Sequence, residues 1–532
     1  MLHQWKTDYH NKKTKRGIFH MEVWCKPITA SVFRHTKRAE QDTNRITLHT
    51  GRNMTDAFQV LFRDSMQAFT VKGYRVDGVP DGMTVSGCAQ GYEVYNDGLA
   101  YPDRLTGKTD VAVASNATQG YIFRVKTDMP EGAVPCLYPI TVTMQIANAD
   151  GTETEMPVYL QVYVHKAQIP SPDHSAFGHE YFFRMAGDDE TNIAYANAMR
   201  ELRVNSLYVN AVPLLCKGGT KKIGAHSWHF DFSAFDHFVN LFLTHGSFRM
   251  LTITGIIHPV DGKQITAIDE AGKGCSMPIF TEDADMEAAS AWAAAFYGSI
   301  AAHCKEMGWH TMLQFHLEDE PHTTESWLWA RTICKQAAPG VPCTEPIDTL
   351  GIGRALGDAC DIPVPRLEVF DTDREYYTSH RAAERAVWCY SCCYPEEPWW
   401  LNKFIDLPAR YARMIKWACY AQDISGFLHW GFNFWSEDSL YGLTPNARFK
   451  GDGFIVYPNT ETENKGVLMS NRGLATTMGL EEWELLHQLG EKDAALAKTM
   501  ACRVARTFRA FAEDPAALDD TRREVLFMLD TL

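Results

Sequence analysis

The sequence predicts a multidomain α/β-plus-β protein: an N-terminal β-sandwich, a central (β/α)8-type barrel and a C-terminal helical extension. Three observations predict it: short strands with turns over residues 44–165, strands alternating with helices over 177–458, and helical patterns beyond 459. A chain of 532 residues is long enough for two or three domains. The predicted boundaries are 1–40 for a lead-in segment, 41–172 for the sandwich, 173–458 for the barrel and 459–532 for the helices.

The sandwich prediction depends on alternation of apolar and polar residues, which is clearest in Val158–His165. Turn signals such as Asp81-Gly82 and Asn96–Gly98 separate the strands, and no helical period interrupts them. Such short strands with regular turns are typical of a β-sandwich. The expected strands are 57–60, 69–76, 121–127, 140–147 and 158–165, followed by an extended linker at Ile169–Asp173.

The central region alternates strands and helices about seven times, which is typical of a (β/α)8 barrel or a close variant. The expected strands are 204–212, 248–258, 312–317, 341–344, 367–370, 387–390 and 427–430. The expected helices between them include 193–203, 235–245, 286–307 and 326–338. Further helices are expected at 481–488, 493–513 and 515–529, where they would cap the barrel.

The N-terminal segment Met1–Trp24 is polar and lysine-rich, without the apolar stretch of a secretory signal. Met21 is a second candidate start, which would make residues 1–20 an upstream extension. The 14 cysteines are scattered through the chain, as in proteins of a reducing compartment. A cytoplasmic location is therefore expected.

Composition also limits the partners and cofactors. A net charge of −15 argues against nucleic acid or an anionic membrane as the main partner, and no apolar run is long enough to span a membrane. Cys389, Cys392 and Cys393 form a lone cluster without a second one at zinc spacing, so no metal and no other cofactor is expected. The abundant aromatic residues suit either sugar binding or core packing.

One stretch concentrates ionisable groups: a buried strand runs into three consecutive acids, Glu318, Asp319 and Glu320, followed by Pro321 and a helix. The carboxyl end of a parallel strand is where ligands bind in α/β folds. Crowded carboxylates raise the pKa of at least one of them, so one can act as an acid while its neighbour stabilises positive charge. The alternative is an acidic first turn that favours the helix dipole.

Other strand ends carry residue types that bind sugars, and we expect them at the same mouth of the barrel. Aromatic faces stack on the apolar face of a pyranose, and polar tips bind its hydroxyls. Each of these residues alone could equally be core packing, so the argument depends on their coincidence. The candidates are His258, Trp388, Tyr390, Trp430, Asn433 and Trp435.

Several motifs resemble glycoside hydrolase family 123 and its DUF4091 relatives, in order along residues 180–490. They are Phe315–His322 (FHLEDEPH), Val387–Cys392 (VWCYSC) with Pro395, Asn402–Asp406 (NKFID) with the segment Arg410–Trp417, Gly426–Trp435 (GFLHWGFNFW), and Gly451–Pro458 (GDGFIVYP) with Ser470 and Arg472. The segment Gly178–Asp189 departs from the pattern, and Pro135–Tyr138 lacks a usual glycine. The departures lie away from the acids, so they bear on substrate choice and domain packing.

The resemblance implies a β-N-acetylgalactosaminidase that works by substrate assistance, in which the sugar's 2-acetamido oxygen attacks the anomeric carbon. By matching positions, Glu320 would be the general acid/base, and Asp319 would orient the acetamido group and stabilise the charge of the oxazolinium. Glu318 would point away and be structural. The implied partner is a glycan or glycoconjugate substrate.

Two alternatives stay open from the residues. One is a conventional retaining glycosidase, with Glu320 as acid/base and Glu345 or Glu368 as nucleophile. The other is a non-catalytic carbohydrate-binding protein, which the intact Asp319–Glu320 pair disfavours because binding gains little from crowded carboxylates.

Overall fold

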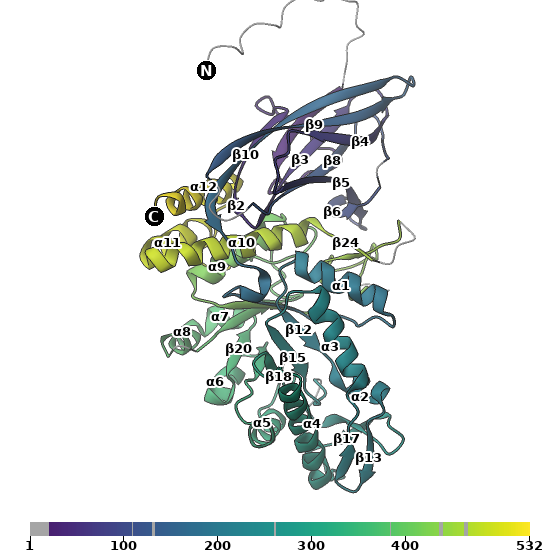
Figure 1. The fold of residues 1–532 in the computed structure, drawn as a ribbon, viewed down its shortest axis with the longest axis vertical. Helices are drawn as coiled ribbons and strands as arrows, with labels where there is room; N and C mark the ends of the chain where they lie inside the picture. Colours follow the sequence, from purple (N-terminus) through teal and green to yellow (C-terminus); the bar gives the residue numbers. More distant parts are fainter. Residues whose placement is uncertain are drawn as a thin grey trace, which may run out of the picture.

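The computed structural model describes residues 21–108, 110–129, 134–259, 262–383, 385–435, 440–461 and 466–532. The possible upstream extension, residues 1–20, therefore lies outside the described residues. Figure 1 shows a region of strands at the top and an α/β region below it, with helix α10 (Asn471–Lys492) between the two. In the described residues, no helix is long and apolar enough to cross a membrane.

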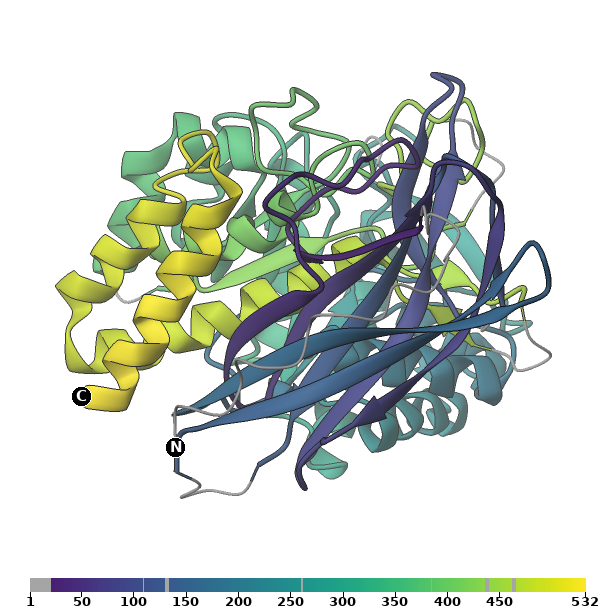
Figure 2. The ribbon, with the colours of Figure 1, turned by 90° about the horizontal axis from the view of Figure 1, so that it is seen from above.

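The N-terminal region consists of two five-stranded sheets that share one hydrophobic core. All neighbouring strands are antiparallel except β2 and β10, which are parallel. The first sheet has the order β1 (Met21–Pro27), β3 (Met54–Asp64), β8 (Thr118–Thr127), β5 (Met83–Val94), β6 (Ala100–Thr106). The second has the order β2 (Arg45–Arg52), β10 (Glu153–Gln168), β9 (Cys136–Asn148), β4 (Phe69–Asp77), β7 (Val111–Val113). Figure 2 shows these strands from above, with the C-terminal helices beside them.

The sheets begin earlier in the chain than the predicted boundary at residue 41. Strand β1 pairs with β3 along its whole length, from Met21 opposite Asp64 to Pro27 opposite Phe58. Its central residue Trp24 is fully buried. Residues 21–27 thus belong to the first sheet, although their basic surroundings in the sequence resemble a lead-in segment.

The α/β region contains eight parallel strands. Six form one sheet in the order β18 (Leu313–His316), β15 (Met250–Thr254), β12 (Ser206–Val209), β11 (Gly178–Tyr181), β22 (Gly426–His429), β21 (Trp388–Ser391). The other two, β19 (Thr344–Ile347) and β20 (Ile362–Pro365), form a separate pair. Single parallel bridges connect this pair to the larger sheet, Phe315 with Cys343 on one side and Arg366 with Tyr390 on the other. Because the sheet is not continuous around all eight strands, the closed barrel stays a prediction.

Helices and two hairpins connect these strands. The helices are α1 (Asp189–Glu201), α2 (Ala211–Gly218), α3 (Ser233–His245), α4 (Met286–Glu306), α5 (Glu325–Ala337), α6 (Ile352–Leu356), α7 (Leu367–Thr372), α8 (Arg374–Ala382) and α9 (Arg410–Ala421). The hairpins are β13 (Lys221–Gly224) with β14 (Ser227–His229), and β16 (Gln264–Ile268) with β17 (Gly274–Pro278). Residues 457–458 and 467–468 form the short pair β23 (Tyr457–Pro458) and β24 (Val467–Leu468).

One predicted strand is wrong. Leu367–Phe370 lies in helix α7, and the strand is β20, which immediately precedes it. Strand β20 contains Pro363 and Pro365, which have no backbone N–H to donate to a neighbouring strand. In a sequence, such prolines therefore indicate that a strand is interrupted. Prolines are tolerated near the margin of a sheet, and β20 has only one bridge to its neighbour β21.

Strand β11 was not predicted, because its sequence Gly-His-Glu-Tyr is polar. The Glu180 side chain is fully buried and accepts hydrogen bonds from the hydroxyls of Ser206 on β12 and Thr252 on β15. These donors satisfy a carboxylate in a position where an apolar residue is normally expected.

The indole of Trp388, at the start of β21, packs across the two neighbouring strands β22 and β11. A glycine in each strand leaves the space that the indole occupies. A Cβ atom at Gly426 would lie 2.3 Å from the indole, and one at Gly178 would lie 2.1 Å from it.

We expect Gly426→Ala to lower the free energy of unfolding by about 1–3 kcal/mol, because the indole has to move within a packed core. Urea denaturation measures this, with Gly187→Ala as the matched control, since nothing lies within 4 Å of its Cβ position.

Helix α10 joins the two regions. It packs against α9 on one side and against β3 and β6 on the other. Across this contact, Arg472 pairs with Asp103 at 3.0 Å, and Glu481 accepts the backbone N–H of Thr55 at 2.8 Å. Helices α11 (Ala494–Val504) and α12 (Pro515–Thr531) follow, and Arg522 of α12 pairs with Asp56 of β3 at 2.7 Å. The regions therefore share buried charges.

Candidate active site

The three consecutive acids lie in a loop between β18 and α5, not in the first turn of the helix. Helix α5 begins at Glu325 after the N-cap residue Thr324, so Pro321 precedes it by four residues. The acid in the first turn is Glu325. Stabilisation of the helix dipole, the alternative explanation of the three acids, therefore does not account for them.

Asp319 lies beside a neutral histidine. Its Oδ1 is 3.6 Å from His316 Nε2, which is also 3.6 Å from Glu345 Oε1. Burial lowers the pKa of His316 to about 3, so the ring carries no positive charge to balance Asp319. The Asp319 side chain is 44% exposed. Its pKa is nevertheless raised to about 7, mainly by desolvation and to a smaller extent by the negative charges of Glu320 and Asp348. The site thus holds a carboxyl group that changes charge near neutral pH.

Glu320 has a strained backbone and one specific partner. Its φ of +48° is in the left-handed region, which costs a non-glycine residue about 1–3 kcal/mol and is found mainly at functional sites. The hydroxyl of Tyr390 donates a hydrogen bond to its Oε1. Burial raises the pKa of Glu320, and the Tyr390 hydrogen bond offsets part of this rise. Tyr390 thus orients the carboxyl and adjusts its acidity.

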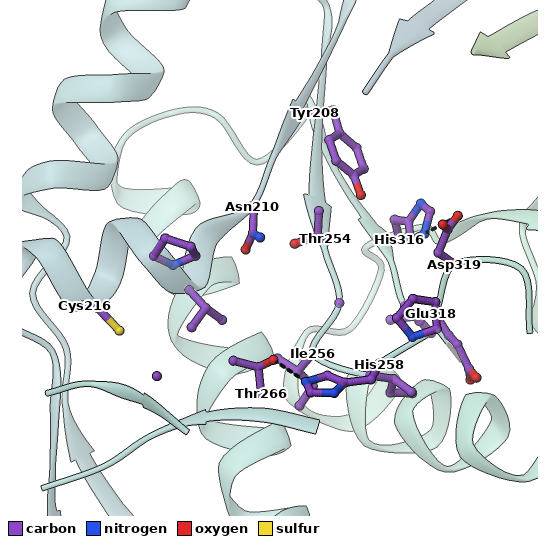
Figure 3. Close-up of a pocket in the computed structure, with 17 residues that line it drawn as sticks. Tyr208, Asn210, Cys216, Thr254, Ile256, His258, Thr266, His316, Glu318 and Asp319 are labelled. Atoms are coloured by element: carbon purple, nitrogen blue, oxygen red, sulfur yellow. Dashed lines mark hydrogen bonds and ion pairs between the residues drawn. The ribbon is translucent and has the colours of Figure 1, made fainter. Parts of the chain in front are cut away.

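The other carboxylates near the loop have structural partners. Glu318 is buried and accepts the Ser326 hydroxyl at 2.8 Å, and its carboxylate points away from that of Asp319 (Figure 3). Glu345 is fully buried and accepts the Trp327 indole N–H at 2.6 Å and the Leu317 backbone N–H at 3.1 Å.

Two cavities meet at Asp319. We call the first the hairpin cavity, because Thr266 and Gly274 of the β16–β17 hairpin form part of its wall; its volume is about 640 Å³ (Figure 3). We call the second the aromatic cavity, with a volume of about 430 Å³. It is lined by Phe182, Asp319, Glu320, Pro346, Tyr390, Cys392, Cys393, Leu428, Trp430, Phe434 and Tyr441. Both volumes are typical of small-molecule sites.

The structure brings three of the six predicted sugar-binding residues to these cavities. Tyr390 and Trp430 line the aromatic cavity, and the Trp430 indole N–H donates to Asp452 at 2.7 Å. His258 lines the hairpin cavity, where its Nε2 contacts the Thr266 hydroxyl at 2.8 Å.

The other three predicted residues are not among those that line either cavity. Trp388 lies against Gly178 and Gly426, below the mouth. Asn433 accepts the backbone N–H of Arg184 and donates to its carbonyl, at 2.8 and 2.9 Å. The Trp435 indole donates to the Val456 carbonyl at 2.8 Å. The Asn433 amide and the Trp435 indole are thus used to hold neighbouring backbone.

Sequence reasoning missed Phe182, Tyr208 and Tyr441. Phe182 follows the unpredicted strand β11 and stacks on Tyr208 with ring centroids 3.9 Å apart. Tyr208 lies within an expected strand but carried no motif, and Tyr441 follows the last strand in a loop. Of the three, only Phe182 directly follows a strand end, which is the position where ligand-binding residues are expected in this fold class.

In the described part of the chain, no group of three or more His, Cys, Asp or Glu side chains is placed to hold a metal. The expectation of a reaction without metal or other cofactor stays a prediction.

The model of the glycoside hydrolase 123 catalytic domain matches residues 162–489, more than half of the chain. The chain belongs to glycoside hydrolase family 123. The resemblance seen in the motifs is thereby confirmed, and the family implies hydrolase activity.

A solved structure resembles this family 123 protein over nearly its whole length. It is a family 123 glycoside hydrolase from Clostridium perfringens, studied for glycolipid glycan hydrolysis, with a TM-score of 0.75 and 13% identity over 96% of this chain and 98% of that one. At this identity the likeness shows the fold alone. A GH10 xylanase with a bacterial Ig-like domain, from termite gut, has a TM-score of 0.35 and 11% identity over 82% and 99%, which carries no argument. The comparison with curated proteins gives no match.

Proposed function

We propose that the protein hydrolyses β-linked N-acetylgalactosamine in glycans or glycoconjugates, with retention and by substrate assistance, on a (β/α)8-type scaffold. One observation carries the proposal: Asp319 and Glu320 are adjacent where two cavities meet. Among the described residues that line these cavities, the only other carboxylate is Glu318, which is buried against Ser326. A reaction that uses the substrate's own acetamido oxygen needs no protein nucleophile.

The first step forms the oxazolinium. The sugar binds in the aromatic cavity, where Trp430 and Tyr441 offer ring faces, and the aglycone extends into the hairpin cavity. The acetamido oxygen attacks the anomeric carbon, the bond to the aglycone breaks, and Glu320 gives its proton to the leaving oxygen. Ionised Asp319 accepts the acetamido N–H and stabilises the positive ring.

The second step returns the enzyme to its starting state. Water attacks the anomeric carbon, Glu320 takes its proton, and the ring opens to restore the acetamido group. The same carboxyl therefore serves as acid and then as base, a role that suits a group held in place by Tyr390.

The conventional retaining alternative is less well supported. Glu345 is fully buried, and its oxygens accept from Trp327 and from the backbone of Leu317 and Glu318. Glu368 lies at the start of α7 and pairs with Arg366 at 3.2 Å. Neither is among the residues that line the two cavities.

A matched set of aryl β-glycosides tests the proposal. Galactose- and glucose-configured substrates are compared with a 2-acetamido or a 2-hydroxyl group and the same aryl leaving group. We expect hydrolysis only of the acetamido substrates, and faster hydrolysis in the galactose configuration. Equal hydrolysis of 2-hydroxyl substrates would support the conventional mechanism.

The pH dependence follows from the shifted carboxyl groups. The active form has ionised Asp319 and protonated Glu320, and the charge of Glu320 is one cause of the raised Asp319 pKa, so the pair titrates in two coupled steps. We expect kcat/KM of the free enzyme to rise with pH through the lower step, its acid limb, and to fall through the upper step at about 7. In kcat this acid limb should move to lower pH, because the acetamido N–H favours the ionised form. Initial-rate profiles of both parameters measure this, and identical acid limbs would contradict the assigned contact.

A further inference from the structure

Two adjacent thiols form part of the wall of the aromatic cavity. Cys392 and Cys393 follow β21 directly, and their sulfur atoms are 3.9 Å apart. Both are half-buried and line the cavity together with Asp319 and Glu320. All 14 cysteines are free, and another close pair, Cys343 and Cys360, is buried in the core. The pair in the cavity wall differs because a small molecule can reach it.

The backbone that carries the pair is held from both sides. The Cys392 N–H donates to the Tyr394 carbonyl at 3.0 Å, and the Cys392 carbonyl accepts the Asn402 side-chain amide at 3.0 Å. The same amide donates to the Pro395 carbonyl at 2.9 Å. Because these bonds fix the loop, a ligand that needs both sulfurs finds them already positioned, with little entropy lost on binding.

The two thiols differ in acidity. The hydrogen bond between the two thiols is the main cause of a lowered pKa at Cys393, and the Tyr441 hydroxyl adds to it. The thiolate is the nucleophilic form of cysteine, so Cys393 is the sulfur expected to react first. If the pair only packed as small apolar side chains, neither thiol would need to face the cavity.

The spacing favours a ligand that bridges the sulfurs through one atom. A direct disulfide needs the sulfurs at about 2.05 Å and Cα atoms usually 4.4–6.8 Å apart. Adjacent residues have Cα atoms only about 3.8 Å apart, so a disulfide would distort this loop. A bridging atom leaves the sulfurs further apart.

We propose that Cys392 and Cys393 form a two-thiol modification site for trivalent arsenicals and similar thiophilic electrophiles, and that its occupation closes the aromatic cavity to the sugar. In the reaction with an arsenoxide, two As–S bonds form and the arsenic–oxygen bond breaks. The oxygen leaves as water with both thiol protons, and nothing is oxidised or reduced. The second half of the proposal rests on the proposed function; the first does not.

The experiment treats the full-length protein, reduced beforehand and freed of reductant, with phenylarsine oxide and measures the intact mass. We expect one adduct per chain, removed by an excess of a dithiol but not by a monothiol. Tethering a second thiol typically raises affinity about 10²–10⁴-fold, so Cys392→Ser and Cys393→Ser should each weaken labelling by about that factor. The matched control is Cys136→Ser, which removes an exposed single thiol in β9 and should label like the parent.

The closure of the aromatic cavity is tested by hydrolysis of the aryl 2-acetamido glycoside. The rate of each labelled variant is compared with the rate of the same variant before treatment. The parent should lose activity on labelling and regain it with dithiol, whereas both serine variants should be insensitive. A missing adduct, or one that persists in both serine variants, overturns the site. An adduct that leaves hydrolysis unchanged overturns the closure of the cavity. If no acetamido glycoside is hydrolysed, the proposed function fails, and the mass measurement still decides the site.

Discussion

Asp319→Asn is expected to lower kcat on aryl 2-acetamido-β-glycosides by about 10²–10³-fold, a loss of about 3–4 kcal/mol of transition-state stabilisation. The change is nearly isosteric, so the amide can still hydrogen-bond the acetamido group. It cannot neutralise a cation, and the adjacent imidazole of His316 is neutral and gives no compensation. Steady-state kinetics and a thermal melt separate this loss from misfolding.

A thiazoline that mimics the oxazolinium gives a second measurement on the same variant. It should inhibit the parent strongly and the Asn variant much less, because the carboxylate that balances its charge is gone. Glu325→Gln is the matched control, since it removes one negative charge from an exposed position a few residues away. An insensitive parent, together with a glycosyl group trapped on another carboxylate, would replace substrate assistance with the conventional mechanism.

Glu320→Gln is expected to lower the rate of hydrolysis of substrates with poor leaving groups by about 10²–10⁴-fold, because no proton can be delivered to the departing oxygen. Substrates with good leaving groups, such as activated phenols, need little protonation and should be affected much less. A series of aryl leaving groups of graded acidity measures the difference. Equal losses across the series would remove Glu320 from the role of acid.

Much of the architecture could be predicted from periodicity. Helices α3 and α4 were expected within a few residues of their observed bounds, and the expected strand 158–165 lies inside the longer β10, because each of these segments has an apolar face. Strand β11 was missed because its inward residue is Glu180, and β20 was missed because it contains two prolines. In both strands, tertiary partners override the local pattern.

The proposed catalytic pair could be located from sequence, but the cavity around it could only be predicted in part. Asp319 and Glu320 stand out because adjacent acids after a buried strand are unusual. Trp388 and Asn433 have residue types that also suit packing and backbone hydrogen bonding, and a single sequence does not distinguish these uses. The left-handed backbone of Glu320 has no sequence signal, since it depends on the surrounding loop.

The position of α10 also limits how this protein can be divided. Arg472 and Glu481 are buried and have partners, Asp103 and Thr55, that belong to the strand region. Cutting the chain between the two regions would leave buried charges without partners, a loss of about 3–5 kcal/mol for a broken ion pair. Gene fusions that exchange the strand region for another domain would therefore have to supply equivalent partners for Arg472 and Glu481.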